Sequence, residues 1–158
     1  MLFRSALRSL PALCFSLPEA DLFDATTGIY SNPVQHGGEW ERRAAVEWIE
    51  TDGSTGFHTD AGLRIHGGAG RIPFFTPKHA LRLDFRGEYG ASRLKHRVFP
   101  DSQVDSFDRL TLRSCSTDSF DIMDVDVNEY PRARATYTRD IWMRDTQLAM
   151  AQIGRAHV

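Results

Sequence analysis

The residues whose types and spacing suit chemistry are concentrated in one glycine-rich segment. Gly68 and Gly70 lie close together, with Arg71 directly after them and Lys78 shortly beyond. Glycines allow the backbone to approach a phosphate group closely, and the two cations can supply the charge that a phosphate requires. The segment therefore predicts a phosphate-binding loop formed by Gly68, Gly70, Arg71 and Lys78.

This loop differs from the common phosphate-binding motif. The sequence GxxxxGK[ST] is absent, and the alternation of residues 79–86 predicts that a strand, not a helix, follows the loop. A strand, a glycine loop, a second strand and a lysine are instead the order of parts in the N-terminal lobe of a kinase. A glycine-rich connection with a purely structural role is also common, and it remains open on spacing alone.

A second chemical candidate is the acidic segment 118–129. When an EF-hand calcium loop is started at Asp124, its sixth position is Glu129, where glycine is needed, and its twelfth is Ala135, where glutamate is needed. The calcium motif therefore fails. The segment predicts a solvated acidic loop without a dedicated metal site.

Histidine and cysteine chemistry has no support from spacing. The histidines form no HxxxH pair and no GxSxG sequence is present, so zinc binding and serine hydrolysis are not indicated. His66 and His79 are therefore expected to be structural. Cys14 and Cys115 match no CxxC spacing, and both are expected to be buried thiols.

Composition and charge limit the class of protein. A hydrophobic content of 41%, with 25% charged residues, is typical of a globular domain, and a net charge of −2 argues against nucleic-acid binding. No segment approaches the ~20 apolar residues of a membrane span. The apolar stretch in residues 1–17 is interrupted by Arg8 and Pro11 and lacks a small-residue cleavage site, so no signal peptide is predicted.

The hydrophobic periodicity predicts an α+β fold that is mostly antiparallel β with one C-terminal helix. The clearest strand alternates Leu81, Leu83 and Phe85 with charged residues. Polar residues 51–54 predict a hairpin turn, and residues 114–134 show no period, which predicts a mobile loop. Strands are expected at residues 13–17, 43–50, 62–66, 79–86 and 109–113, and a helical turn at residues 18–24. The first of these strands is predicted to be buried.

The predicted helix begins near Tyr137, and its apolar face is expected to contain Tyr137, Ile141, Trp142, Leu148 and Ala149. Residues 153–158 have the sequence expected from a sequencing adapter read in frame, so the domain is expected to cover residues 1–152. A native end closed by Gly154 is the alternative, because glycine often ends helices.

Several short sequence motifs follow one another in a defined order along nearly the whole chain. They are residues 10–13, 20–23, 27–33, 39–42, 61–68, Arg71, 77–83, 88–90, 99–102, 107–108, 112–113, 118–119 and 139–140. In this order they resemble the CotH kinase-like family of spore-coat proteins, especially its large secreted bacterial members. No single motif is specific to the family. The resemblance rests on the order in which the motifs occur.

The resemblance implies an atypical kinase fold that transfers phosphate from ATP with a divalent metal, Mg or Mn. The chain would be an incomplete N-terminal lobe of a secreted or cell-surface protein, with a protein as a possible substrate. Arg71 and Lys78 would lie in the nucleotide-binding part, and the catalytic residues would lie beyond residue 158, so the chain alone is expected to be inactive. A kinase lysine pairs with a helix acid, here Asp140 or Asp145, although pairing with Arg139 or Arg144 is the stronger expectation.

An alternative from a different class is a non-catalytic extracellular module that binds a partner or has a structural role. Its aromatic surface would be formed by Tyr30, Trp40 and Trp48. Large aromatic side chains are more often part of a core, which is the simpler expectation for these three.

Overall fold

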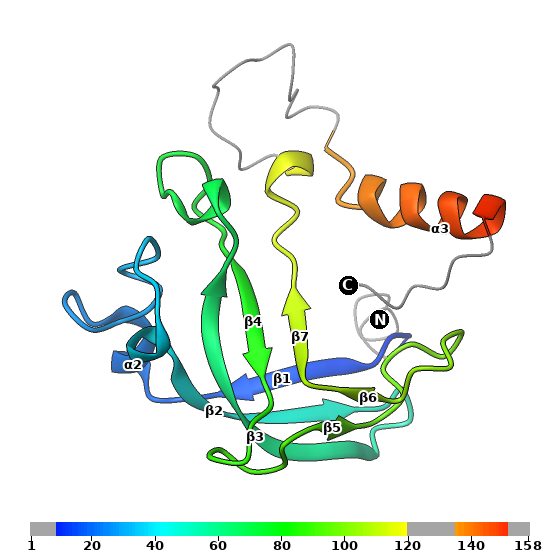
Figure 1. Ribbon diagram of the computed structural model, residues 1–158, viewed down its shortest axis with the longest axis horizontal. Coiled ribbons are helices and arrows are strands. Elements are labelled where there is room, and N and C mark those ends of the chain that lie inside the picture. Colours follow the sequence, from blue (N-terminus) through cyan, green and yellow to red (C-terminus); the bar gives the residue numbers. More distant parts are fainter. Residues whose placement is uncertain (1–8, 120–134, 152–158) are drawn as a thin grey trace, which may run out of the picture.

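The computed structural model describes residues 9–119 and 135–151 (Figure 1). Its main feature is a five-stranded antiparallel sheet with the strand order β1-β2-β3-β4-β7. The strands are β1 (Ala12–Ser16), β2 (Arg42–Ile49), β3 (Thr55–His66), β4 (Ala80–Asp84) and β7 (Arg109–Leu112), and a small second sheet pairs β5 (Leu94–Lys95) with β6 (Ser106–Phe107). The helices are α2 (Glu19–Phe23) and α3 (Arg139–Ala151), with 3-10 turns η1 (Gly38–Trp40), η2 (Ala69–Arg71) and η3 (Ser116–Asp118). The predicted α+β class, mostly antiparallel with a C-terminal helix, is confirmed.

The hairpin between β2 and β3 has the predicted turn at residues 51–54. The Asp52 carboxylate accepts hydrogen bonds from the backbone N–H and the hydroxyl of Ser54, and Gly53 has a φ of +87°, which favours glycine. β3 is longer than predicted, because pairing with β2 carries the strand back to Thr55 through residues that show little hydrophobic pattern. The small sheet β5–β6 was not predicted from its short, irregular segments.

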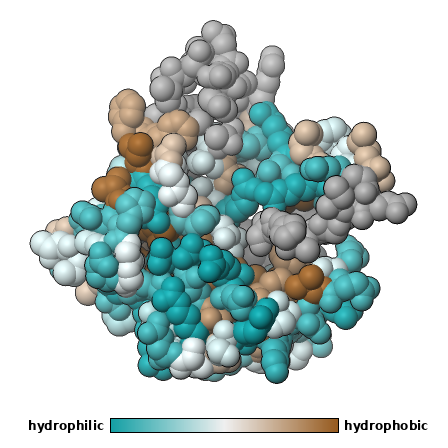
Figure 2. Space-filling view, in the orientation of Figure 1, coloured by the Kyte–Doolittle hydropathy of each residue, from teal (hydrophilic) through white to brown (hydrophobic). Residues whose placement is uncertain are grey.

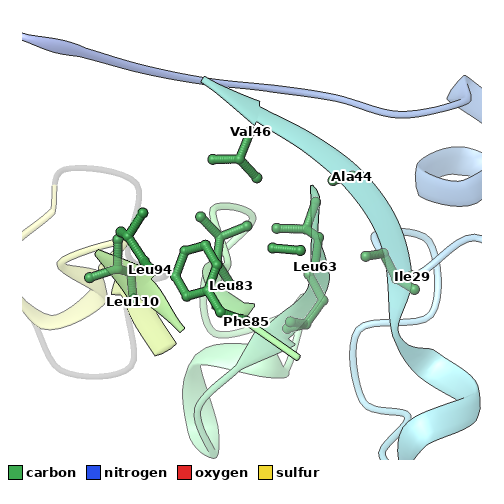
Figure 3. Close-up of a cluster of buried hydrophobic side chains, with 10 residues drawn as sticks. Ile29, Ala44, Val46, Leu63, Leu83, Phe85, Leu94 and Leu110 are labelled. Atoms are coloured by element: carbon green, nitrogen blue, oxygen red, sulfur yellow. The ribbon is translucent and has the colours of Figure 1, made fainter. Parts of the chain in front are cut away.

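The core lies on one face of the large sheet and is made by alternate residues of its strands (Figure 3). Leu63 of β3 lies opposite Leu83 of β4, which in turn lies opposite Leu110 of β7. The buried hydrophobic cluster is Ile29, Ala44, Val46, Ala61, Leu63, Ile65, Leu83, Phe85, Leu94 and Leu110. The predicted alternation of Leu81, Leu83 and Phe85 therefore marks the buried face of β4, as expected for a half-buried antiparallel sheet.

The opposite face of the sheet is polar. Arg64 of β3 lies directly opposite Arg82 of β4, an arrangement that repulsion between the two guanidinium groups would disfavour. Each arginine is balanced by a carboxylate: Arg64 Nη1 lies 3.2 Å from Glu41, and Arg82 Nε lies 2.9 Å from Asp84. Hydrophilic residues also cover most of the surface seen in Figure 2, and apolar atoms are gathered near the connection between β3 and β4, where Ile72 and Phe74 are exposed.

Helix α3 presents apolar residues to the solvent in the described part of the chain. Ile141 is 57% exposed, Trp142 65% and Met150 82%. The helix lies beyond the end of the sheet and does not cover it (Figure 1). The helix prediction is confirmed, whereas Ile141 and Trp142 of its predicted apolar face are not buried against the sheet; the side chain of Leu148 lies outside the described residues.

Two predictions about the N-terminal strand are wrong. β1 is an edge strand with Leu13 and Phe15 only partly buried, whereas a buried strand was predicted. The thiol of Cys14 is exposed, and Cys115 is intermediate in exposure, so the expectation of two buried thiols fails for Cys14. Cys14 is exposed because its side chain lies on the face of the sheet away from the core. Leu13 and Phe15 are on the core side, but at the edge of the sheet they have neighbouring side chains on one flank only.

Three of the sequence-based predictions fall wholly or partly outside the described residues. They concern residues 1–8 of the apolar N-terminal stretch, most of the acidic segment at 120–134, and the tail at 152–158. Within the described ranges, no helix combines the length and apolarity needed to cross a membrane.

Candidate functional site

The glycine-rich connection leaves β3 at His66 and turns sharply at Gly67, whose φ of +108° is a conformation that favours glycine. A methyl group built on Gly68 would meet no atom within 4 Å, so the backbone there is open to a ligand. At Gly70 the same methyl group would lie 3.5 Å from the Ser116 hydroxyl. The loop is therefore accessible at Gly68 and partly covered at Gly70.

Arg71 lies beneath this loop and is only 6% exposed. Its Nε donates to the Gly67 carbonyl at 2.6 Å, Nη1 donates to the carbonyls of Pro33 and Gln35 at 2.9 and 2.8 Å, and Nη2 donates to the carbonyl of Ile65. These acceptors converge from two distant segments. The planar guanidinium can serve them together because it carries five donors. Arg71 therefore braces the loop, in contrast to the phosphate contact predicted for it.

His79 holds the other side of the loop. Its Nδ1 lies 2.8 Å from the carbonyl oxygen of Gly70, so Nδ1 carries the hydrogen in this contact, and the side chain is buried. The hydroxyl of Tyr30 donates to the Pro77 carbonyl at 3.2 Å and accepts from the His79 backbone N–H at 3.3 Å. The structural role predicted for His79 is confirmed.

Lys78 is exposed and lies just before β4, at the end of the same connection. Its Nζ lies 5.6 Å from the centroid of the Tyr137 ring, within the range of a cation–π contact. Tyr137 lies two residues before α3, and its hydroxyl lies 2.9 Å from that of Ser119. Lys78 is thus brought to the start of α3, and in the part of the chain that is described no carboxylate forms an ion pair with it.

The start of α3 is held by Asp118. Its carboxylate accepts hydrogen bonds from the backbone N–H groups of Thr136 and Arg139, at 3.0 and 3.2 Å, and from the Thr136 hydroxyl at 2.9 Å. The Thr136 backbone hydrogen bond is the main cause that lowers the pKa of Asp118. Asp118 and Ser119 are buried, so the predicted solvated loop is wrong for these two residues. The free N–H groups of a helix start favour an acidic partner, which explains the difference.

Asp140, a candidate helix acid, is paired with arginines. It contacts Arg113, at the end of β7, and lies 3.5 Å from Nε of Arg144 one turn along α3. The expected pairing of Asp140 with Arg144 is confirmed, whereas a kinase-type pairing of Asp140 with Lys78 is not present in the structure.

A buried carboxylate on the polar face of the sheet was missed by sequence reasoning. The side chain of Glu41 is fully buried, with Oε2 3.2 Å from Arg64 Nη1 and 3.3 Å from Arg86 Nη2. Tyr89 lies beside it: burial, followed by the interaction with the Glu41 carboxylate, raises the pKa of Tyr89 to about 12. Glycine at position 62 leaves room for the group, because a methyl there would lie 2.2 Å from Glu41 Oε1. No spacing signal joins residues so distant in the sequence.

The three aromatic residues of the alternative module take part in internal contacts. The Trp48 ring stacks on Phe57 at 6.2 Å, the Arg42 guanidinium lies over Trp40 at 5.8 Å, and Tyr30 is used in the hydrogen bonds described above. None of the three belongs to the buried cluster, but Tyr30 and Trp40 are half-buried against it, so the expectation that these aromatics form part of the core is met in part.

His66, at the end of β3, gives a first testable prediction. Burial is the main cause that lowers its pKa, and the charges of Arg82, Arg71 and Arg64 act in the same direction. The unfolded chain therefore binds a proton more readily than the folded chain, so the free energy of unfolding should decrease as the pH falls through and below 6.5, the ordinary value for histidine.

The measurement is urea unfolding at a series of pH values from neutral to mildly acidic. The variant His66→Gln should reduce the loss of stability on acidification, whereas His58→Gln, at an exposed position of the same strand, should leave it unchanged. Equal pH dependence in all three proteins would refute the role assigned to His66.

A metal centre is not apparent in the described residues, where no group of three or more His, Cys, Asp or Glu side chains is placed to hold an ion. Comparison with protein-family models, curated proteins and solved structures finds no match to this chain. The resemblance to the CotH kinase-like family therefore stays a prediction based on the ordered motifs.

Proposed function

We propose that this chain is part of an ATP-dependent, CotH-like phosphotransferase and that its glycine-rich connection binds the phosphates of the nucleotide. The observation that supports this best is the position of Lys78. Its exposed ammonium group lies at the start of α3 and at the end of a connection whose backbone is open at Gly68. A five-stranded antiparallel sheet carries all of these parts.

The predicted site residues would have different roles in binding the nucleotide. Gly68 and Gly70 would offer backbone that a phosphate can approach, and Lys78 would offer positive charge. Arg71 would act indirectly, because its donors are already committed to backbone carbonyls. A loop braced in this way by Arg71 and His79 loses little conformational entropy on binding, which favours affinity.

The divalent metal implied by the resemblance does not fit the described residues, which form no metal-binding group. The proposal therefore assigns only nucleotide binding to the described residues, and it derives no transfer step from them. Phosphoryl transfer also requires a positioned nucleophile and stabilisation of the transferred group.

The direct test is replacement of Lys78 by alanine. Loss of one charge-assisted contact should weaken ATP binding about tenfold. Isothermal titration calorimetry would measure the dissociation constant with and without Mg²⁺. Lys95→Ala is the matched control, because Lys95 is the other lysine of the chain and is exposed on β5.

Lys78→Arg should retain most of the affinity, since the positive charge is kept. If ATP does not bind, or if Lys78→Ala and Lys95→Ala weaken binding equally, the nucleotide site is not at this loop. The non-catalytic binding or structural module would then be the better reading.

A further inference from the structure

β1 lies at one edge of the five-stranded sheet and pairs with β2 on one side only (Figure 1). Among the described residues, no segment pairs with its outer edge. An unpaired edge presents backbone N–H and C=O groups that can bind another strand, and proteins usually protect such edges with charges, prolines or bulges.

The two edges of this sheet differ in that protection. At the opposite edge, β7 begins with the exposed Arg109 and is followed by the exposed Arg113. β1 has the sequence Ala-Leu-Cys-Phe-Ser, with no charge anywhere and no proline inside the strand, and it pairs with β2 in a regular register. Pro11 directly precedes the strand. The β1 edge is therefore the one that is suited to bind a strand.

The side chains of β1 are symmetric about Cys14. Ala12, Cys14 and Ser16 are small and exposed, whereas Leu13 and Phe15 are partly buried and pack against the core. If a second β1 runs antiparallel with Cys14 opposite Cys14, Ala12 lies opposite Ser16 and Leu13 lies opposite Phe15. Small residues then face small residues, and apolar residues face apolar residues on the side of the core.

We propose that the β1 edge binds a second copy of this chain, in the antiparallel register centred on Cys14. The two sheets then form one continuous sheet around a twofold axis, an isologous contact of the kind most common in homodimers. A second copy is the occupant because the strand is complementary to itself in both size and polarity, and each copy completes the hydrogen bonding of the other.

The contact is short, so the dimer is expected to be weak, with a dissociation constant on the order of 10–100 µM. Directly opposed residues in antiparallel strands have Cα atoms about 4.5–5.5 Å apart. This separation falls within the ~4.4–6.8 Å range of disulfides, so the two exposed Cys14 thiols report on the register.

Sedimentation equilibrium over a range of concentrations around that value tests the dimer. Oxidised glutathione then tests the register: it takes up two electrons and two protons from a pair of Cys14 thiols, which form a disulfide while two glutathione thiols are released. Peptide mass spectrometry should identify Cys14 joined to Cys14 of a second copy.

Cys14→Lys should weaken the dimer at least tenfold, because two like charges would meet at the axis, whereas Gln103→Lys adds the same charge to an exposed loop and should not. Carboxymethylation of Cys14 in the folded Cys115→Ser protein gives a test that does not depend on refolding. It should weaken the dimer more than the neutral carboxamidomethyl group. A monomer at all concentrations, a dimer that tolerates both charges at Cys14, or a disulfide that requires Cys115 would overturn the proposal.

Discussion

Replacing Arg71 by alanine is expected to lower the free energy of unfolding by about 3–5 kcal/mol. The buried guanidinium donates to carbonyl groups from the end of β3, from Gly67 and from the segment containing Pro33 and Gln35. Without it, these acceptors lose a shared partner, and the hydrogen bonds lost at the carbonyls of Pro33 and Ile65 are buried. Urea unfolding followed by circular dichroism would measure the loss.

Two further variants separate the geometry of Arg71 from its charge. Arg71→Lys keeps the positive charge but has no planar fork, so it should recover only a minor part of the lost stability. Arg97→Ala, at an exposed loop position, should change the unfolding free energy by less than about 0.5 kcal/mol. Full recovery by lysine would show that charge alone matters, which contradicts the bracing role.

Replacing Glu41 by alanine is expected to cost about 3 kcal/mol. Its carboxylate is fully buried between Arg64 and Arg86, and its removal leaves two guanidinium groups without their shared counter-charge. Thermal and urea unfolding would measure the effect. Glu19→Ala, which removes an exposed carboxylate on α2, is the matched control and should be nearly neutral.

Tyr89 provides a second measurement on the same group. Since burial and the Glu41 carboxylate together raise the pKa of Tyr89 to about 12, Glu41→Gln should move it down, toward the ordinary value of 10.0. Ultraviolet absorbance of the ionised phenol would follow the titration, and Tyr89→Phe would identify its contribution. An unchanged Tyr89 titration in Glu41→Gln would show that the two side chains do not interact as described.

The exposed apolar face of α3 is a second surface through which copies of the protein could associate. Ile141, Trp142 and Met150 present apolar area to the solvent, and such surfaces promote association. Association through this face would not depend on Cys14, so the charged substitution and the modification at Cys14 distinguish it from pairing at β1.

The candidate site was predicted from the sequence only in part. The openness expected at Gly68 and the exposed charge of Lys78 follow from residue types, and both are present. The role of Arg71 could not be predicted, because it depends on carbonyl groups of Pro33 and Gln35 that reach it only after the chain folds. Burial then turns a cation suited to phosphate into a brace for the loop.

The sequence by itself determined the local structure of this protein. Alternating side chains at Leu81, Leu83 and Phe85 define which face of β4 is buried, and Asp52 and Gly53 define the turn that reverses β2 into β3. These features depend on neighbours in the chain, so short-range sterics and hydrogen bonding are sufficient to specify them.

Only the tertiary structure decided which elements become neighbours. The position of β1 at the edge exposes Cys14, and the meeting of Glu41 with Arg64 and Arg86 joins residues far apart in the chain. Asp118 caps α3 across a gap in sequence for the same reason. Residue type defines what a side chain can bond, but desolvation and the choice of partner arise only when distant segments pack together.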